Sequence, residues 1–217
     1  MNKTITLKNF SFAFPKKALF SDINLDLSLS GIHLLTGANG SGKTTLCRIL
    51  LALQSGFSGK VLIDDLDVTT TTTEFIAEKI VYLKQSAALN LLAATPWLDL
   101  AVWTDKFSGT SHQDEIREAL DYFDLLAFQD KPVWELSGGQ RQRLALSALL
   151  LNNKKFWLLD EPAAGLDSTQ QQKLKALLIQ HAPHNGALII THRFPLFADI
   201  ADNIYEISNQ SLILRNT

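Results

Sequence analysis

The sequence IHLLTGANGSGKTTL, residues 32–46, combines a short apolar run, a glycine-rich loop and the beginning of a helix. The apolar run is typical of a buried strand, and after the loop apolar side chains recur at helical spacing from Leu46 to Leu53. The loop matches G-x-x-x-x-G-K-[ST] in full between Gly37 and Thr44. Strand, loop and helix in this order are the context that this phosphate-binding motif requires, and they predict an α/β nucleotide-binding core.

The glycine loop has the chemistry to hold the phosphates of a nucleotide. Glycines let successive backbone N–H groups point into one concavity at the positive end of the following helix. We expect Lys43 to reach the β- and γ-phosphates and the Thr44 hydroxyl to bind Mg²⁺. The alternative, a glycine-rich turn with a solvated lysine, leaves the flanking strand and helix unexplained. The expected ATP-binding residues are Gly37, Ala38, Asn39, Gly40, Ser41, Gly42, Lys43, Thr44 and Thr45.

A second apolar run, LLDEP at residues 158–162, delivers two carboxylates, Asp160 and Glu161. Alternate residues of a strand point to opposite sides, so these two can take different roles. Asp160 fits the magnesium side, and Glu161 is then free to orient or deprotonate a water that attacks the γ-phosphate. An Asp-Glu pair on its own is more often a helix start or a solvated strand end. Because a phosphate-binding loop stands upstream, we favour the catalytic interpretation here.

The stretch LSGGQRQR, residues 136–143, places two adjacent glycines just before RLALSALLL, which has the pattern of a helix. Each glycine costs a helix interior about 1 kcal/mol relative to alanine. Some feature at this position therefore requires bare backbone.

Composition narrows the class of protein. The chain has 217 residues, 46% of them hydrophobic, with a formal net charge of -2 and no block of basic residues. These values indicate one globular domain, and no nucleic-acid partner is expected. Cys47 is the only cysteine, so no internal disulfide can form, and the first residues lack the apolar core of a signal peptide. No apolar run approaches the ~20 residues of a membrane helix, so we predict a cytoplasmic protein that can serve a membrane only through a partner.

Hydrophobic periodicity divides the chain into a β-rich start, an α/β centre and a helical insertion. Apolar residues from Ile23 to Leu29 alternate with polar ones, as in a half-buried strand of an antiparallel sheet. The apolar runs at 156–160 and 187–191 are typical of a buried parallel sheet. We predict a single domain, 1–217, with a β and catalytic core at about 1–86 and 152–217 and a helical subdomain at about 87–151.

These motifs, taken in order, resemble the ATP-binding cassette of ABC transporters. YLKQ ends in Gln85 at the place of the family's Q-loop glutamine, LSGGQ stands at the signature, and Asp160 and Glu161 stand at the Walker B pair. AGLD, ending in Asp167, resembles the D-loop, and His192 in ITHR resembles the switch histidine. The resemblance implies a P-loop NTPase core with an N-terminal antiparallel β subdomain and an inserted α-helical subdomain.

The resemblance also implies site roles. Mg²⁺ would be held by Thr44, Gln85 and Asp160, and the catalytic residues would be Lys43, Gln85, Glu161 and His192. Phe14, in SFAFP, stands where the family places an aromatic that stacks on adenine, a contact of ~1–3 kcal/mol. The alternative for Phe14 is a place in the sheet core, because Phe10 and Phe12 share its alternation.

In the family two cassettes pair head to tail, which would explain the double glycine. Ser137, Gly138, Gly139 and Gln140 would face the γ-phosphate of ATP on the neighbouring cassette, where side chains would hold the anion away. The alternative is a helix-capping Ser-Gly-Gly turn, which explains the helix start but not Gln140. The implied partners are a second ABC ATPase subunit and an integral membrane transporter subunit, with this chain peripheral on the inner face of the membrane.

The leading hypothesis is therefore the ATPase subunit of a transporter whose membrane part is a separate chain. A soluble ABC-type ATPase acting on ribosomes or DNA is an alternative, but it would normally carry two cassettes or a long coiled coil. A non-catalytic nucleotide switch would lack Glu161, His192 or the signature, and all are present. Within transporters, FSFAFP, AATPWLDLAV and DEPAAGLD are most similar to ATPases of energy-coupling-factor and of metal or vitamin importers.

The apolar segment from Ala87 to Trp103 follows Gln85, where the family receives a helix of the membrane subunit. We expect part of this docking surface here, with Trp97 as its anchor and Asp99 on its polar rim. The alternative is that the large side chains of the segment pack inside the helical subdomain.

Overall fold

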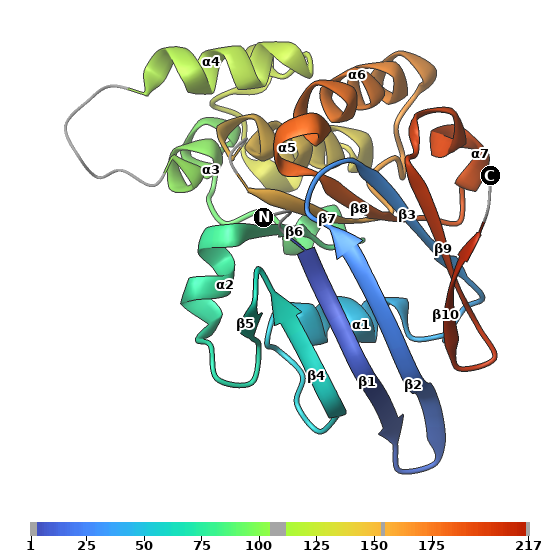
Figure 1. Ribbon diagram of the computed structural model, residues 1–217. Helices are drawn as coiled ribbons and strands as arrows, with labels where there is room; N and C mark the ends of the chain where they lie inside the picture. The colour runs from blue at the N-terminus through green and yellow to red at the C-terminus, as the bar shows by residue number, and fades with distance from the viewer. Residues whose placement is uncertain (1–3, 105–111, 153–154, 216–217) are drawn as a thin grey trace.

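The computed structural model describes residues 4–104, 112–152 and 155–215, which fold into two β-sheets with most of the helices gathered around the larger sheet (Figure 1). The strands are β1 (Thr4–Phe14), β2 (Lys17–Ser28), β3 (Ile32–Gly37), β4 (Ser58–Ile63), β5 (Leu66–Asp67), β6 (Ile80–Leu83), β7 (Phe156–Asp160), β8 (Ala187–Ile190), β9 (Asn203–Ser208) and β10 (Ser211–Arg215). The helices are α1 (Lys43–Leu50), α2 (Thr73–Lys79), α3 (Pro96–Trp103), α4 (Gln113–Tyr122), α5 (Gly138–Leu151), α6 (Ser168–Asn185) and α7 (Phe194–Phe197). Short 3₁₀ turns are η1 (Ala87–Leu89), η2 (Leu126–Phe128), η3 (Val133–Glu135) and η4 (Ala198–Ile200).

The larger sheet has the order β10-β9-β3-β8-β7-β6, and all its neighbouring strands are parallel except β10, which is antiparallel to β9. The smaller sheet, β2-β1-β4-β5, is antiparallel throughout. The predicted α/β class is confirmed, with its N-terminal antiparallel sheet and central parallel sheet.

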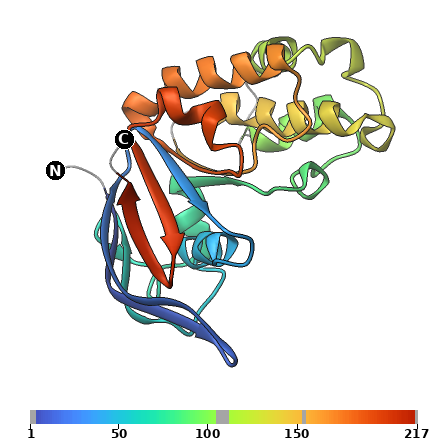
Figure 2. The ribbon, with the colours of Figure 1, turned by 90° about the vertical axis from the view of Figure 1, so that its right-hand side faces the viewer.

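Two hydrophobic cores lie on opposite faces of the larger sheet, because successive side chains of a strand point to opposite sides. On β7, Trp157 and Leu159 belong to the core beneath α4, α5 and α6, while Phe156 and Leu158 belong to the core that contains α1 and the antiparallel sheet. Figure 2 shows α1 between the two sheets and the longer helices on the other side. Burial on both faces explains why these strands read as continuous apolar runs.

Helices α3, α4 and α5 follow β6 and precede β7, as the helical pattern between residues 87 and 151 predicts. The subdomain boundaries near 86 and 151 stay a prediction, since α5 packs into the same core as the central sheet. None of the helices in the described ranges combines the length and the apolarity needed to cross a membrane.

Candidate functional site

Four parallel strands bring the predicted site residues to one edge of the larger sheet. The glycine loop follows β3, Gln85 follows β6, Asp160 ends β7 and His192 follows β8. Ligands of open α/β sheets bind at the carboxyl ends of the strands. Here those ends open into a cavity of about 520 Å³ lined by Phe14, Lys17, Leu19, Asn39, Gly40, Gly42, Lys43, Thr44, Thr45, Gln85, Asp160, Glu161 and His192.

The glycine loop adopts backbone angles that other residues rarely take. Gly37, Gly40 and Gly42 have φ of 144°, 72° and 114°. A Cβ on Gly42 would lie 2.7 Å from the ring of Phe20, and one on Gly37 would lie 2.8 Å from the carbonyl oxygen of Ile207. Both positions therefore exclude a side chain for steric as well as conformational reasons.

The Lys43 side chain folds back onto the glycine loop. Its Nζ donates hydrogen bonds to the carbonyl oxygens of Gly37 at 2.7 Å and Ala38 at 3.1 Å, and the residue is buried. Burial lowers the pKa of the Lys43 ammonium, while the carboxylates of Asp160 and Glu161 oppose this shift. The two carbonyl oxygens thus fix the ammonium beside the cavity.

Asp160 and Thr44 form the part of the site that fits a magnesium ion. Burial and the neighbouring Glu161 raise the pKa of the Asp160 carboxyl, whereas Lys43, His192 and a hydrogen bond with the Thr44 side chain lower it. A carboxylate, a hydroxyl and the amide oxygen of Gln85 are hard oxygen donors, as Mg²⁺ prefers. In the described parts of the chain no group of three or more His, Cys, Asp or Glu side chains could hold a metal alone. The oxygen donors of Asp160, Thr44 and Gln85 therefore suit a metal that takes its remaining ligands from phosphates.

Glu161 is fixed by the segment that follows β8. One carboxylate oxygen accepts the backbone N–H of His192 at 2.5 Å, and the other accepts the Thr191 hydroxyl at 3.2 Å. Glu161 also has φ of 49°, a left-handed conformation that is uncommon for a residue with a side chain. Sequence reasoning missed Thr191, although it stands directly before the predicted switch histidine.

The side chains of His192 and Gln85 reach the same cavity from its open side. His192 Nε2 lies 3.9 Å from a Glu161 oxygen, and its side chain is 51% exposed. Gln85 is exposed as well. Both residues are therefore accessible to a ligand that enters between the strand ends.

Phe14 lies in the cavity wall and not in the sheet core. It is 46% exposed, whereas Phe10 and Phe12 are buried, so the core alternative is wrong. Lys17, which sequence reasoning missed, lines the same cavity and donates from Nζ to the carbonyl oxygen of Gly40 at 2.8 Å. The FPKK turn could have indicated it, since it places a cation beside the aromatic ring.

The signature residues do not line this cavity. They begin α5 with a capping box, in which the Ser137 hydroxyl accepts the Gln140 N–H at 3.2 Å and the Gln140 side chain accepts the Ser137 N–H at 2.7 Å. The expectation that a cap leaves Gln140 unexplained is wrong, because its side chain completes the box.

The two signature glycines have different surroundings. A Cβ on Gly138 would meet open space, whereas a Cβ on Gly139 would lie 2.9 Å from the carbonyl oxygen of Gly165 in the predicted D-loop. Asp167, at the end of that loop, caps α6 by accepting the N–H of Gln170 at 2.9 Å. The signature and D-loop therefore touch within one chain.

The expected place of Asp99 on a polar rim is wrong, while the docking role of Trp97 stays a prediction. Trp97 is partly buried against the helical core, and Asp99 is fully buried. The Asp99 carboxylate accepts the N–H groups of Leu92 at 2.5 Å and Ala93 at 3.0 Å, so it fixes the turn before α3. The exposed apolar side chains of this region are Leu89, Leu92, Leu98, Val102 and Trp134.

Comparison with protein families matches residues 20–164, more than half of the chain, to the family described as ABC transporter. The chain is 32% identical to the cytochrome c biogenesis ATP-binding export protein CcmA of Reclinomonas americana, covering 95% of this chain and 91% of that protein. It is 31% identical to the energy-coupling factor transporter ATP-binding protein EcfA1 of Leuconostoc mesenteroides, covering 100% of this chain and 82% of that protein. These relatives carry export and transporter names alike, so similarity does not favour one direction of transport.

Solved structures agree on the fold. CbiO1 of Clostridium perfringens, described as part of the ABC transporter complex cbiONQ, superposes with a TM-score of 0.80 at 24% identity, covering 98% of this chain and 88% of that one. A bacterial Atm1-family ABC exporter with ATP bound gives a TM-score of 0.85 at 22% identity, covering 98% of this chain and 38% of that one.

Proposed function

The chain belongs to the ABC transporter family as an ATP-binding and ATP-hydrolysing subunit, and we propose that it hydrolyses ATP at a site that a second cassette completes. The glycine loop of one cassette holds the nucleotide, and the signature of the other, Ser137 to Gln140, covers the γ-phosphate. ATP then forms part of the interface, and its hydrolysis dissolves the pair. This cycle turns binding and chemistry into motion.

The observation that supports this pairing is the backbone at the start of α5. The first four N–H groups of a helix have no acceptor within it. The capping box satisfies those of Ser137 and Gln140, while those of Gly138 and Gly139 have no acceptor among the residues described. Two free N–H groups at a helix start, with no side chains beside them, are suited to an anion. Because these groups lie outside the cavity of their own chain, we assign the anion to a partner's nucleotide.

Within one cassette, each group of the cavity has a role. Phe14 stacks on the base, and Lys43 and the loop N–H groups bind the phosphates. Glu161 accepts a proton from water as the water oxygen bonds to the γ-phosphorus. The bond to the bridging oxygen breaks, and its electron pair leaves with ADP. A general base of this kind contributes roughly 10²–10⁴-fold to the rate.

The segment after β8 orients that base. The N–H of His192 and the hydroxyl of Thr191 hold both carboxylate oxygens of Glu161. The His192 side chain and Gln85 line the same cavity, and we assign the γ-phosphate to the space beside them. Thr44, Asp160 and Gln85 would hold the Mg²⁺ that accompanies ATP, and the ion would supply positive charge against the charge that develops on the phosphates.

A membrane subunit is the second partner. Leu98 and Val102, four residues apart on α3, are exposed on one face of the helix. The N–H of Val133 donates to the carbonyl oxygen of Ala94 at 2.9 Å, which brings the segment of Trp134 beside the start of α3. Exposed apolar side chains of this size mark interaction sites, and tryptophan is enriched at their centres. Docking a helix of the membrane subunit here places the chain on the inner face of the membrane.

Replacing Glu161 with glutamine tests this function. The side chain keeps its size but loses the carboxylate, so ATP still binds while turnover falls by about two orders of magnitude or more. The variant should accumulate as an ATP-bound dimer in size-exclusion chromatography. Glu118→Gln, on the exposed face of α4, is the matched control and should hydrolyse ATP like the wild type. Near-normal hydrolysis by Glu161→Gln would move the base elsewhere, and a monomer with bound ATP would reject the shared site.

A further inference from the structure

Asp124 occupies a backbone conformation that a glycine would adopt more easily. It lies in the turn after α4 with φ of 55°, in the left-handed region. Its N–H donates to the carbonyl oxygen of Asp121 at 3.0 Å, so the turn is well defined. An outlier that persists at a side-chain-bearing residue raises the question of what its side chain does.

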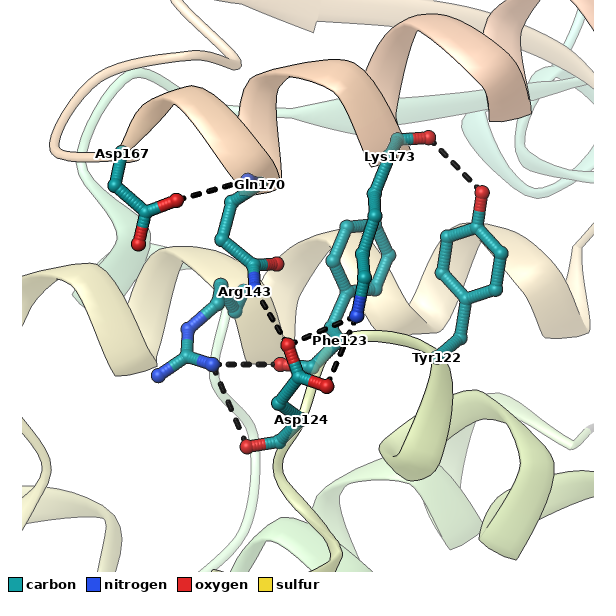
Figure 3. Close-up of polar contacts among 7 residues, drawn as sticks. All are labelled: Tyr122, Phe123, Asp124, Arg143, Asp167, Gln170 and Lys173. Carbon is teal, nitrogen blue, oxygen red and sulfur yellow. Dashed lines mark hydrogen bonds and ion pairs between the residues drawn. The ribbon is translucent and has the colours of Figure 1, made fainter.

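The Asp124 carboxylate binds two residues of α6 (Figure 3). It accepts hydrogen bonds from Lys173 Nζ at 2.9 and 2.8 Å and from Gln170 Nε2 at 2.6 Å. Hydrogen bonds from Lys173 and then Gln170, with the charge of Arg143 adding to them, lower the pKa of the Asp124 carboxyl. The carboxylate is therefore charged at neutral pH.

The backbone of the same turn binds α5. Arg143 Nη1 donates to the carbonyl oxygen of Phe123 at 2.7 Å and of Asp124 at 3.4 Å. Arg143 lies on α5, one turn after the signature. The Tyr122 hydroxyl adds a bond to the carbonyl oxygen of Lys173 at 2.9 Å. The turn thus fastens α5 on one side and α6 on the other.

Gln170 carries this connection to the D-loop. Its side chain donates to Asp124, and its backbone N–H donates to Asp167, the residue that caps α6 (Figure 3). A direct contact runs beside it, since Gln142 on α5 donates to the carbonyl oxygen of Pro162 at 2.8 Å. The signature helix and the loop from Glu161 to Asp167 are consequently joined at several points.

Stability does not explain these contacts. The side chains of Asp124 and Lys173 are 57% and 30% exposed, and ion pairs that reach the solvent contribute little to folding. A glycine at position 124 would adopt this left-handed conformation more easily, but it would have no carboxylate. What the carboxylate adds is a link to α6 from a turn whose backbone oxygens are already bound by Arg143 of α5.

We propose that Asp124 is a positioning residue for ATP hydrolysis, which sets the D-loop relative to the signature of the same chain. This inference rests on the proposed function, because the two segments act together only when both face a second cassette. Asp124 does not line the ATP cavity, so its effect is on the assembly of the shared site and not on the binding of nucleotide to one chain.

Asp124→Asn is the sharpest variant. Asparagine has the same shape and tolerates the left-handed region, but it removes the charge. The matched control is Asp199→Asn, which takes a carboxylate away from Lys175 on the same helix α6 without touching α5. We expect Asp124→Asn to lower kcat about tenfold, and to weaken the ATP-dependent dimer of a Glu161→Gln background by a similar factor. ATP affinity of the monomer and the melting temperature should match those of the control.

Lys173→Met should lower kcat as Asp124→Asn does. The double variant should be no worse than either single one, because both substitutions remove the same ion pair. Equal kcat in Asp124→Asn and Asp199→Asn would overturn the proposal, as would a loss of kcat that follows a loss of melting temperature. If Glu161→Gln itself stays monomeric with ATP, the shared site is wrong. If Glu161→Gln dimerises equally with and without Asp124→Asn, only the role of Asp124 is rejected.

Discussion

The two signature glycines should respond in opposite ways to the same methyl group. In the folded monomer a Cβ on Gly138 meets open space, while one on Gly139 comes within 2.9 Å of the backbone oxygen of Gly165. That distance is shorter than real Cβ contacts, and a backbone oxygen cannot turn aside as a side chain can. Gly139→Ala must therefore move α5 or the D-loop, whereas Gly138→Ala moves neither.

The magnitude follows from two effects. Alanine in place of glycine favours a helix by up to about 1 kcal/mol, and this gain applies to both variants. Overpacking costs roughly 1–3 kcal/mol and applies to Gly139→Ala alone. The free energy of unfolding of the two variants should thus differ by the overpacking cost. For a chain of this size that corresponds to a difference of roughly 2–12 °C in melting temperature, with Gly138→Ala the more stable.

Thermal unfolding without nucleotide, followed by circular dichroism, measures this difference. ATP-dependent dimer formation of the same variants, in a Glu161→Gln background, measures the second role. We expect Gly138→Ala to unfold at or above the wild-type temperature and bind ATP as a monomer, yet to lose the dimer, because its methyl group occupies the place of the partner's phosphate. Equal melting temperatures would refute the steric argument at Gly139, and a normal dimer of Gly138→Ala would refute the anion site.

Three further predictions concern other parts of the chain. Lys43→Ala should weaken ATP binding to the monomer, whereas Ser137→Arg should leave it intact and abolish the ATP-dependent dimer; equal losses in a fluorescent nucleotide titration would mean that the signature acts within its own chain. Burial raises the pKa of Asp99, although the hydrogen bonds from the Leu92 and Ala93 N–H groups oppose this shift. The charged carboxylate therefore lowers the stability of the fold at pH values above its folded pKa. This loss of stability disappears as the pH falls toward the ordinary aspartate pKa of about 3.9. The melting temperature of Asp99→Asn minus that of the wild type should therefore be larger at pH 7 than near pH 4, and a difference independent of pH would contradict the raised pKa. Trp134→Glu should keep the fold and basal ATPase but reduce recovery of a co-expressed membrane subunit, while Trp97→Glu should lower the melting temperature; unimpaired recovery with Trp134→Glu would remove that residue from the docking face.

Local sequence patterns predict the strands and the glycine loop, because each of these features depends on residues close together in the sequence. The alternation from Ile23 to Leu29 and the run from Phe156 to Asp160 follow from which faces are buried, and the glycines of the loop follow from backbone angles. The convergence of Gln85 and His192 with the loop was also predictable in outline, because carboxyl ends of parallel strands share one edge.

The predicted exposure of side chains around α3 was partly wrong, because their burial depends on packing against other helices. Trp97 and Leu98 are neighbours of similar hydrophobicity, yet the first packs against the core and the second is 51% exposed. Asp99 is polar, yet it is fully buried because it accepts two N–H groups of a turn that the sequence alone does not define. Which face of a short apolar helix turns inward is set by its packing against α4 and α5, which follow later in the chain.

The start of α5 shows why a cap and an anion site were wrongly treated as alternatives. A helix presents four free N–H groups, and a capping box can satisfy only two of them. Ser137 and Gln140 take those two, which fixes the helix start without help from a partner. The N–H groups of the glycines between them stay free for a ligand, and a preformed helix end does not have to be ordered when that ligand arrives. In the shared site that we propose, the cap and the double glycine therefore act together: Gly138 leaves room for the anion, and Gly139 lets the same turn lie against Gly165.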